Sequence, residues 1–225
     1  MDFFLGITNR CNLDCELCAH RKLRNLQPTY IMQPSEFEKW YNFTDAAGYR
    51  FSAIDFNGLG EPTLYPDLDF FKYMLIRVKK FTPQVNILTN GTRLQVLEKL
   101  LPFVSNITIS KWQDYPRYHP GINWLASMYP NKIHVKEYIP CHDMREEVLE
   151  PIPGKICGCS GPGYTMGTVF LNCGTWCPSI SHDGIHHTLL TENYLDDIMS
   201  TGLAIYGMCQ RCWANTSVQY KEILK

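Results

Sequence analysis

Short apolar runs alternate with segments of helical periodicity along the first two thirds of the chain. The apolar runs are expected to be β-strands at residues 2–8, 51–56, 85–89, 104–110 and 132–139. The segments between them repeat apolar residues on one helical face, and we expect helices at residues 34–43, 68–80, 94–101 and 122–129. Strands separated by helices of this length indicate a parallel sheet built from βαβ units.

The number of these units limits the architecture. A complete (β/α) barrel has eight units and takes about 200 residues or more, whereas the alternating pattern ends near residue 145. The sequence therefore predicts an α/β fold whose first domain, residues 1–145, is a partial (β/α) barrel of about five to six parallel strands. The chain begins directly at its first strand, so we expect no recognition domain before the barrel.

Proline and glycine interrupt the remainder of the chain. Six of the ten cysteines of the whole chain lie there, from Cys157 to Cys212. We predict a small C-terminal cysteine-rich module over residues 146–225. The elements expected in it are a hairpin made by residues 165–171 and a strand from residue 176, turning at residues 172–175, and a short helix at residues 194–199.

Composition narrows the class of protein. The formal net charge of the 225-residue chain is −1, so bulk electrostatics do not attract it to nucleic acid or to anionic membranes. No run reaches the roughly 18 apolar residues of a membrane span, and the N-terminus lacks the pattern of a secretory signal. We therefore expect a cytoplasmic protein without a membrane partner. In a reducing compartment, clustered cysteines bind metals or perform chemistry more often than they form disulfides.

The first cysteine group directly follows the first predicted strand. Cys11, Cys15 and Cys18 are spaced so that three thiolates of one loop can bind three irons of a [4Fe–4S] cluster. The fourth iron then stays open to another ligand, and an open coordination position is typical of catalytic rather than structural metal sites. A structural zinc with His20 as fourth ligand is the alternative.

Residues 8–18, Thr-Asn-Arg-Cys-Asn-Leu-Asp-Cys-Glu-Leu-Cys, resemble the signature of the radical S-adenosylmethionine (SAM) superfamily. The resemblance implies that the open iron binds the amino and carboxylate groups of SAM. Reduction by one electron then cleaves SAM to methionine and a 5′-deoxyadenosyl radical, which removes a hydrogen atom from a substrate carbon. The positions that the resemblance assigns to SAM binding are Leu17, Gly60, Glu61, Pro62, Asn90 and Ser110, the last expected at the end of its strand.

The second cysteine group resembles the SPASM/twitch module, which holds an auxiliary [4Fe–4S] cluster. By that resemblance, one ligand precedes the predicted hairpin, one follows it, and a Cys-x2-Cys pair comes later in the chain. The ligands assigned in this way are Cys159, Cys177, Cys209 and Cys212, with Cys157 and Cys173 as alternatives. Zinc in this module remains an alternative.

The auxiliary cluster favours an oxidation, such as alcohol or aminocyclitol dehydrogenation or the modification of a peptide. The partners implied are a small-molecule or peptide substrate and an electron donor such as flavodoxin or ferredoxin. Radical modification of a nucleoside or nucleic acid stays open. Readings from other classes are a zinc-binding interaction protein without turnover and an electron-transfer protein.

Overall fold

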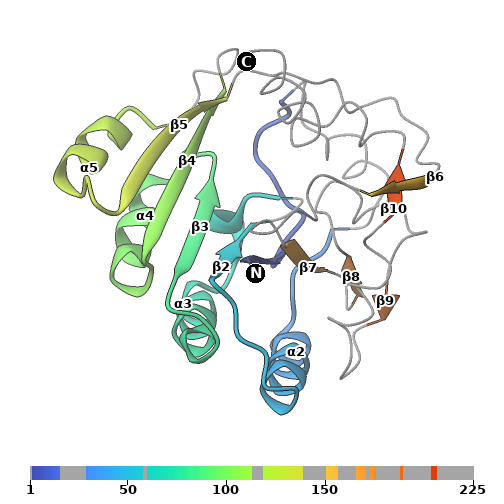
Figure 1. The fold of residues 1–225 in the computed structure, drawn as a ribbon. Helices are drawn as coiled ribbons and strands as arrows, with labels where there is room; N and C mark the ends of the chain where they lie inside the picture. Colours follow the sequence, from blue (N-terminus) through green and yellow to red (C-terminus); the bar gives the residue numbers. More distant parts are fainter. Residues whose placement is uncertain are drawn as a thin grey trace.

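A computed structural model gives the arrangement of the chain (Figure 1). It describes residues 2–15, 29–57, 60–112 and 119–138, together with the strand segments 151–156, 166–170, 173–175, 188–189 and 204–206. Eight strands form the main sheet, in the order β5-β4-β3-β2-β1-β7-β8-β9. The first five along the chain are β1 (Asp2–Leu5), β2 (Ala53–Phe56), β3 (Val85–Thr89), β4 (Asn106–Trp112) and β5 (Ile133–Tyr138).

These five strands are parallel to their neighbours. The helices between them are α2 (Pro34–Ala46), α3 (Leu68–Arg77), α4 (Leu94–Leu100) and α5 (Ile122–Met128), with short 3-10 turns η1 (Pro62–Leu64), η2 (Val78–Lys80) and η3 (Leu101–Phe103). In Figure 1 the helices α2–α5 lie along one side of the strands β1–β5. The predicted α/β fold, a parallel sheet made from βαβ units, is confirmed.

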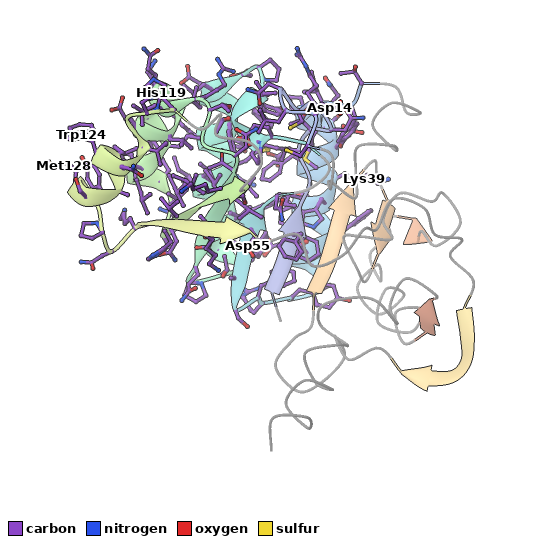
Figure 2. All side chains as sticks on the ribbon, turned by 90° about the horizontal axis from the view of Figure 1, so that it is seen from above. Asp14, Lys39, Asp55, His119, Trp124 and Met128 are labelled. Carbon is purple, nitrogen blue, oxygen red and sulfur yellow. The ribbon has the colours of Figure 1, made fainter. Side chains whose placement is uncertain are left out.

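The core lies between these helices and the sheet. Phe3 of β1 stacks on Trp40 of α2, with ring centroids 5.6 Å apart, and Trp40 meets Phe81 edge-on at 5.9 Å. Strand side chains point alternately to the two faces, and in β3 it is Val85 and Ile87 that are buried against the helices. The helices turn their other sides outward, where Trp124 of α5 is 56% exposed (Figure 2).

Four of the five predicted strands differ from the observed bounds by one to three residues, and the difference in the fourth matters for the site. The fourth strand, expected over residues 104–110, runs from Asn106 to Trp112, so Ser110 is two residues before its end rather than at it. The physical reason is the partner strand: β5 continues to Tyr138, and each further residue of β4 finds a pairing partner there. Ser110 pairs with Lys136 in this register.

The C-terminal part extends the sheet on the free side of β1. β7 (Met166–Phe170) pairs with β1 in parallel, which brings the number of parallel strands in the sheet to six. β8 (Cys173–Thr175) and β9 (Thr188–Leu189) continue it in antiparallel pairing. A separate two-stranded sheet is made of β6 (Pro151–Ile156) and β10 (Ala204–Tyr206).

The hairpin expected in this part exists, but its turn lies elsewhere. Phe170 pairs with Cys173, so only residues 171 and 172 connect β7 to β8. The turn predicted at residues 172–175 is therefore wrong, because residues 173–175, with their glycine, belong to the second strand. Two-residue connections suit the twist of paired antiparallel strands. The helix expected at residues 194–199 lies outside the described residues, and the domain boundary near residue 145 stays a prediction.

Candidate functional site

The candidate site is built at the carboxyl ends of β1, β2 and β3, starting with the loop that carries the first cysteines. This loop leaves β1 and returns at Tyr30. The hydroxyl of Thr8 donates to the carbonyl of Tyr30 at 3.0 Å, and the N–H of Tyr30 donates to Oδ1 of Asn9 at 2.7 Å. A bridge between Thr8 and Ile31 completes the closure. The two ends of the cysteine loop are thus held together by buried hydrogen bonds.

Gly60 brings a second segment against the start of that loop. The N–H of Glu61 donates to the carbonyl of Arg10 at 2.7 Å. A Cβ atom on Gly60 would lie 2.4 Å from the carbonyl oxygen of Arg10 and 2.6 Å from that of Thr8. Any side chain here would push the two backbones apart, so glycine is required for this close approach.

Glu61 joins the segments through its side chain, which is fully buried. Its Oε1 accepts from the hydroxyls of Thr63 and Thr89, both at 2.6 Å, and from the N–H of Thr63 at 3.1 Å. Its Oε2 accepts from the N–H of Asn90 at 2.7 Å. Because Thr63 belongs to η1 and Thr89 ends β3, one carboxyl group ties the turn after β2 to the turn after β3.

Burial raises the pKa of the Glu61 carboxyl above its ordinary value of 4.5. The hydrogen bonds from Thr63, Thr89 and Asn90 lower it, but they do not offset the loss of hydration. The group is therefore a structural acceptor whose charge is costly to hold.

Three polar side chains close a ring beside Cys11. Nδ2 of Asn90 donates to Oδ1 of Asn12 at 2.9 Å, Nδ2 of Asn12 donates to Oγ1 of Thr92 at 2.8 Å, and the Thr92 hydroxyl donates to Oδ1 of Asn90 at 2.7 Å. Gly91, between the last two residues, has a φ of 69°. The ring fixes the Asn90 amide, whose nitrogen also lies 3.8 Å from Sγ of Cys11, within range of an N–H···S hydrogen bond.

Several predicted site residues meet here, and others lie outside the described residues. Cys11 is half-buried and Cys15 is buried. Sγ of Cys11 also accepts from the N–H of Leu13 at 3.5 Å. Within the described ranges, three metal-binding side chains do not gather at one point. The predicted positions outside those ranges are Leu17, Cys18, Cys157, Cys159, Cys177, Cys209 and Cys212.

The remaining predicted positions lie on the same edge of the sheet. Pro62 is buried and begins η1. Ser110 is one residue beyond Ile109, the partner of Thr89, so it lies beside the Asn90 turn on the neighbouring strand. Sequence reasoning missed Asn12, Thr63 and Thr92, which hold the predicted residues in place. The one local signal was the Asn-Gly-Thr order, because an asparagine side chain often accepts from the N–H two residues later.

Comparison with known proteins gives one solved structure that supports this architecture. No protein-family model matches the chain. The solved structure of BtrN in complex with AdoMet and 2-DOIA is similar, with a TM-score of 0.64 and 15% identity over 97% of this chain and 85% of BtrN. That likeness establishes the fold, a partial (β/α) barrel. A weaker likeness, with a TM-score of 0.41 and 18% identity over 60% of this chain and 42% of the other, is to anSMEcpe with bound AdoMet and a peptide.

A curated protein of Pyrococcus furiosus is also similar. It is a tungsten-containing aldehyde ferredoxin oxidoreductase cofactor-modifying protein, 33% identical over 93 residues, or 40% of this chain. The matched part spans 24% of the length of that protein. In the described part of the chain, none of the helices has the length and apolarity needed to cross a membrane.

The Glu61 contacts give a prediction about stability. Replacing Glu61 by Gln should lower the free energy of unfolding by about 1–3 kcal/mol, because an amide nitrogen would face one of the donors that a carboxylate oxygen accepts from. Chemical denaturation measures this loss. Glu98→Gln, at an exposed position of α4, is the matched control and should change stability by less than about 0.5 kcal/mol.

The same pair of proteins should differ in pH dependence. Since the pKa of Glu61 is raised on folding, the folded state favours its protonated form. That contribution is present below pH 4.5 and is lost as the pH rises through the folded-state pKa. The stability difference between wild type and Glu61→Gln should therefore shrink as the pH rises, and a difference that grows would contradict the raised pKa.

Proposed function

We propose that the protein is a radical SAM enzyme in which Cys11, Cys15 and Cys18 hold a [4Fe–4S] cluster. The observation that carries the proposal is the convergence of the cysteine loop, the Gly60–Glu61–Pro62 turn and the Asn90 turn. Residues about 80 positions apart are joined there by direct hydrogen bonds, such as that from Asn90 to Cys11. In (β/α) folds, catalytic groups lie at this carboxyl edge of the sheet.

The donor set fits the cluster. Thiolate sulfurs are the usual ligands of iron–sulfur clusters, and N–H groups of Leu13 and Asn90 are directed at Sγ of Cys11. When bound, a cluster with one open iron would bind SAM and supply the electron that cleaves it. A zinc-binding interaction protein would have no use for the glycine approach at Gly60 or for the buried carboxyl of Glu61.

The chain's own residues position the loop and the turn that carry these groups. The Thr8 and Asn9 bonds to Tyr30 anchor both ends of the cysteine loop before any ligand arrives. The contact between Glu61 and Arg10 places the turn after β2 next to the loop. The resemblance assigns this turn to the amino group of SAM. Preorganisation of this kind reduces the entropy lost when a ligand binds.

We further propose an auxiliary [4Fe–4S] cluster held by Cys159, Cys177, Cys209 and Cys212. The pairing of β7 with β1 supports it, because it brings the β7–β8 hairpin beside the strand that leads to Cys11. Cys177 follows the last residue of β8 by two positions, whereas Cys173 is the first residue of β8. Cys173 and Cys157 remain alternative ligands.

The net reaction that we propose is an oxidation of a small molecule, with the auxiliary cluster accepting an electron from the substrate radical. BtrN contains AdoMet and 2-DOIA in its crystal structure, and this favours a small-molecule substrate over a peptide. A reduced flavodoxin or ferredoxin in the cytoplasm would supply the electron that starts turnover. Modification of a nucleoside is the second candidate product class.

Substitution of the first cysteine group tests the activity. Cys11→Ala or Cys15→Ala should abolish formation of 5′-deoxyadenosine from SAM and dithionite, because each removes a cluster ligand. Product is measured by chromatography after anaerobic reconstitution with iron and sulfide. Cys141→Ala, which removes a cysteine of neither group, is the control and should retain cleavage. Cleavage by Cys11→Ala would refute the assignment.

Iron content tests the auxiliary cluster separately. The reconstituted wild type should contain about eight irons per chain, two clusters of four. Cys209→Ala should lose about four of them and still cleave SAM. An unchanged iron content would contradict the auxiliary cluster, and a colourless protein that binds zinc instead would contradict both clusters.

The Asn90 amide should raise the reduction potential of the first proposed cluster. Hydrogen bonds to cluster sulfurs raise the reduction potential, because they stabilise the more negative reduced state. Asn90→Leu should therefore shift the potential of the first cluster to a more negative value, measured by an EPR-monitored titration without SAM in a Cys209→Ala background. Thr92→Val keeps the Asn90 amide but removes the hydroxyl that orients it and that accepts from Asn12, so it should cause a smaller shift in the same direction. No shift in Asn90→Leu would exclude the N–H···S bond.

A further inference from the structure

A row of polar side chains crosses the face of the sheet that the helices do not cover. Nδ2 of Asn86 donates to Oδ1 of Asp55 at 2.8 Å, and Nδ2 of Asn106 donates to Oδ1 of Asn86 at 3.0 Å. Nε2 of His134 lies 3.4 Å from Oδ1 of Asn106. This polar ladder takes one residue from each of the strands β2, β3, β4 and β5. Figure 2 labels its first member, Asp55, on β2.

The carboxylate at one end of the ladder fixes the direction of every bond in it. An ionised Asp55 can only accept, so Asn86 must turn its NH2 group towards it. Asn86 then presents its oxygen to the NH2 group of Asn106, and the Asn106 oxygen faces His134. The Asn106 oxygen accepts from Nε2 of His134 in the tautomer that carries the proton on that nitrogen.

The ladder does not use up its own hydrogen-bonding capacity. Each of the two asparagines spends one N–H and one oxygen lone pair within the ladder. A second N–H and a second lone pair of each amide therefore remain for a ligand or for water. Asp55, Asn86 and Asn106 are half-buried, so these groups are partly shielded from bulk solvent.

A cavity of about 420 Å³ lies over the ladder. Its lining residues are Phe4, Asp55, Asn57, Asn86, Ile87, Leu88, Asn106, Thr108, His134 and Lys136. This volume is at the lower end of the range for small-molecule sites. Among the lining residues, Asp55 has the only carboxylate and Lys136 the only ammonium group, and they lie on β2 and β5, at opposite sides of the cavity.

The register of the strands places the ladder nearer the amino-terminal ends of the strands than the proposed SAM site. Lys136 pairs with Ser110, which lies on β4 beside the Asn90 turn that follows β3. Asn106 is four residues before Ser110, or about 13 Å along the strand. The lining extends from the ladder to Asn57, which follows the last residue of β2, and to Lys136, so the cavity itself runs from the ladder towards the carboxyl edge.

We infer that this cavity binds the substrate and selects a small polar molecule that carries an amino group. Asp55 receives the amino group, and Lys136 and His134 receive hydroxyl or carboxylate groups at the other side. An apolar molecule would cover the amides of Asn86 and Asn106 without replacing their bonds to water, which is unfavourable. The inference rests on the proposed function, because it takes this ligand to be the molecule that the radical attacks.

Paired sugars test the selection of an amine. D-glucosamine carries an amino group and several hydroxyls, and N-acetyl-D-glucosamine has the same ring with that amine converted to an uncharged amide. Titration calorimetry of the reconstituted full chain with SAM should give at least about tenfold tighter binding of D-glucosamine, the effect of a charge-assisted hydrogen bond. Equal affinities, or no binding of either sugar, would overturn the inference.

Two variants separate the ends of the cavity. Asp55→Asn should reduce the preference for D-glucosamine to about threefold or less, since the amide keeps the shape and can still accept from Asn86 but lacks the charge. Lys136→Gln, at an exposed position, should weaken the binding of both sugars similarly, by about threefold or more, and leave the preference for D-glucosamine unchanged. Asp69→Asn, on the outer side of α3, is the control and should not alter either affinity.

Failure of this inference is distinguishable from failure of the proposed function. Formation of 5′-deoxyadenosine by the wild type without any sugar tests the radical SAM activity alone. If 5′-deoxyadenosine forms and Asp55→Asn keeps the full preference while its circular dichroism matches wild type, the cavity does not select the amine. If 5′-deoxyadenosine does not form, the proposed function fails, and tight amine-selective binding would still establish the cavity as a ligand site.

Discussion

The arrangement of the site depends on the hydrogen bonds to the buried carboxyl group of Glu61. Four donors converge on it, from the η1 turn, from the end of β3 and from the Asn90 backbone. Only a side chain with two acceptor oxygens can satisfy them all. The loss of hydration is the cost, and it is why the pKa of this group is raised rather than lowered. The adjacent Gly60 then sets the distance to the cysteine loop, because no side chain fits there.

The sheet divides its two faces between stability and recognition. On one face, aromatic and aliphatic side chains such as Phe3 and Trp40 pack against the helices. On the other, the polar ladder from Asp55 to His134 spans four strands. The alternation of side chains along each strand makes this division possible within strands of four to seven residues.

Local pattern predicted much of this structure, and the limits follow from distance along the chain. The strand Val85–Thr89 has the predicted bounds, because an apolar run meets an Asn-Gly turn. The predicted hairpin turn is at the wrong residues. Gly174 indicates a turn by local pattern, whereas it pairs with Val169 within the hairpin. The partnership of β7 with β1 joins residues about 160 positions apart and leaves no local trace. The ring of Asn12, Asn90 and Thr92 likewise joins residues far apart in the sequence and could not be predicted from local pattern. The cysteine spacing and the Gly-Glu-Pro sequence are local patterns and could be recognised in the sequence itself.

The place of β1 between β2 and β7 also constrains when the protein can mature. On the ribosome, the cysteines beyond β1 emerge among the first residues, but the strand that completes the pairing of β1 is made only after residue 166. Contacts of such long sequence separation form late in folding. The nascent chain therefore exposes its first thiols well before the sheet around them is complete. Loading of the proposed cluster with iron and sulfide is best suited to the released, full-length protein, and a chain truncated before β7 would keep the cysteine motif and lack the strand that supports it.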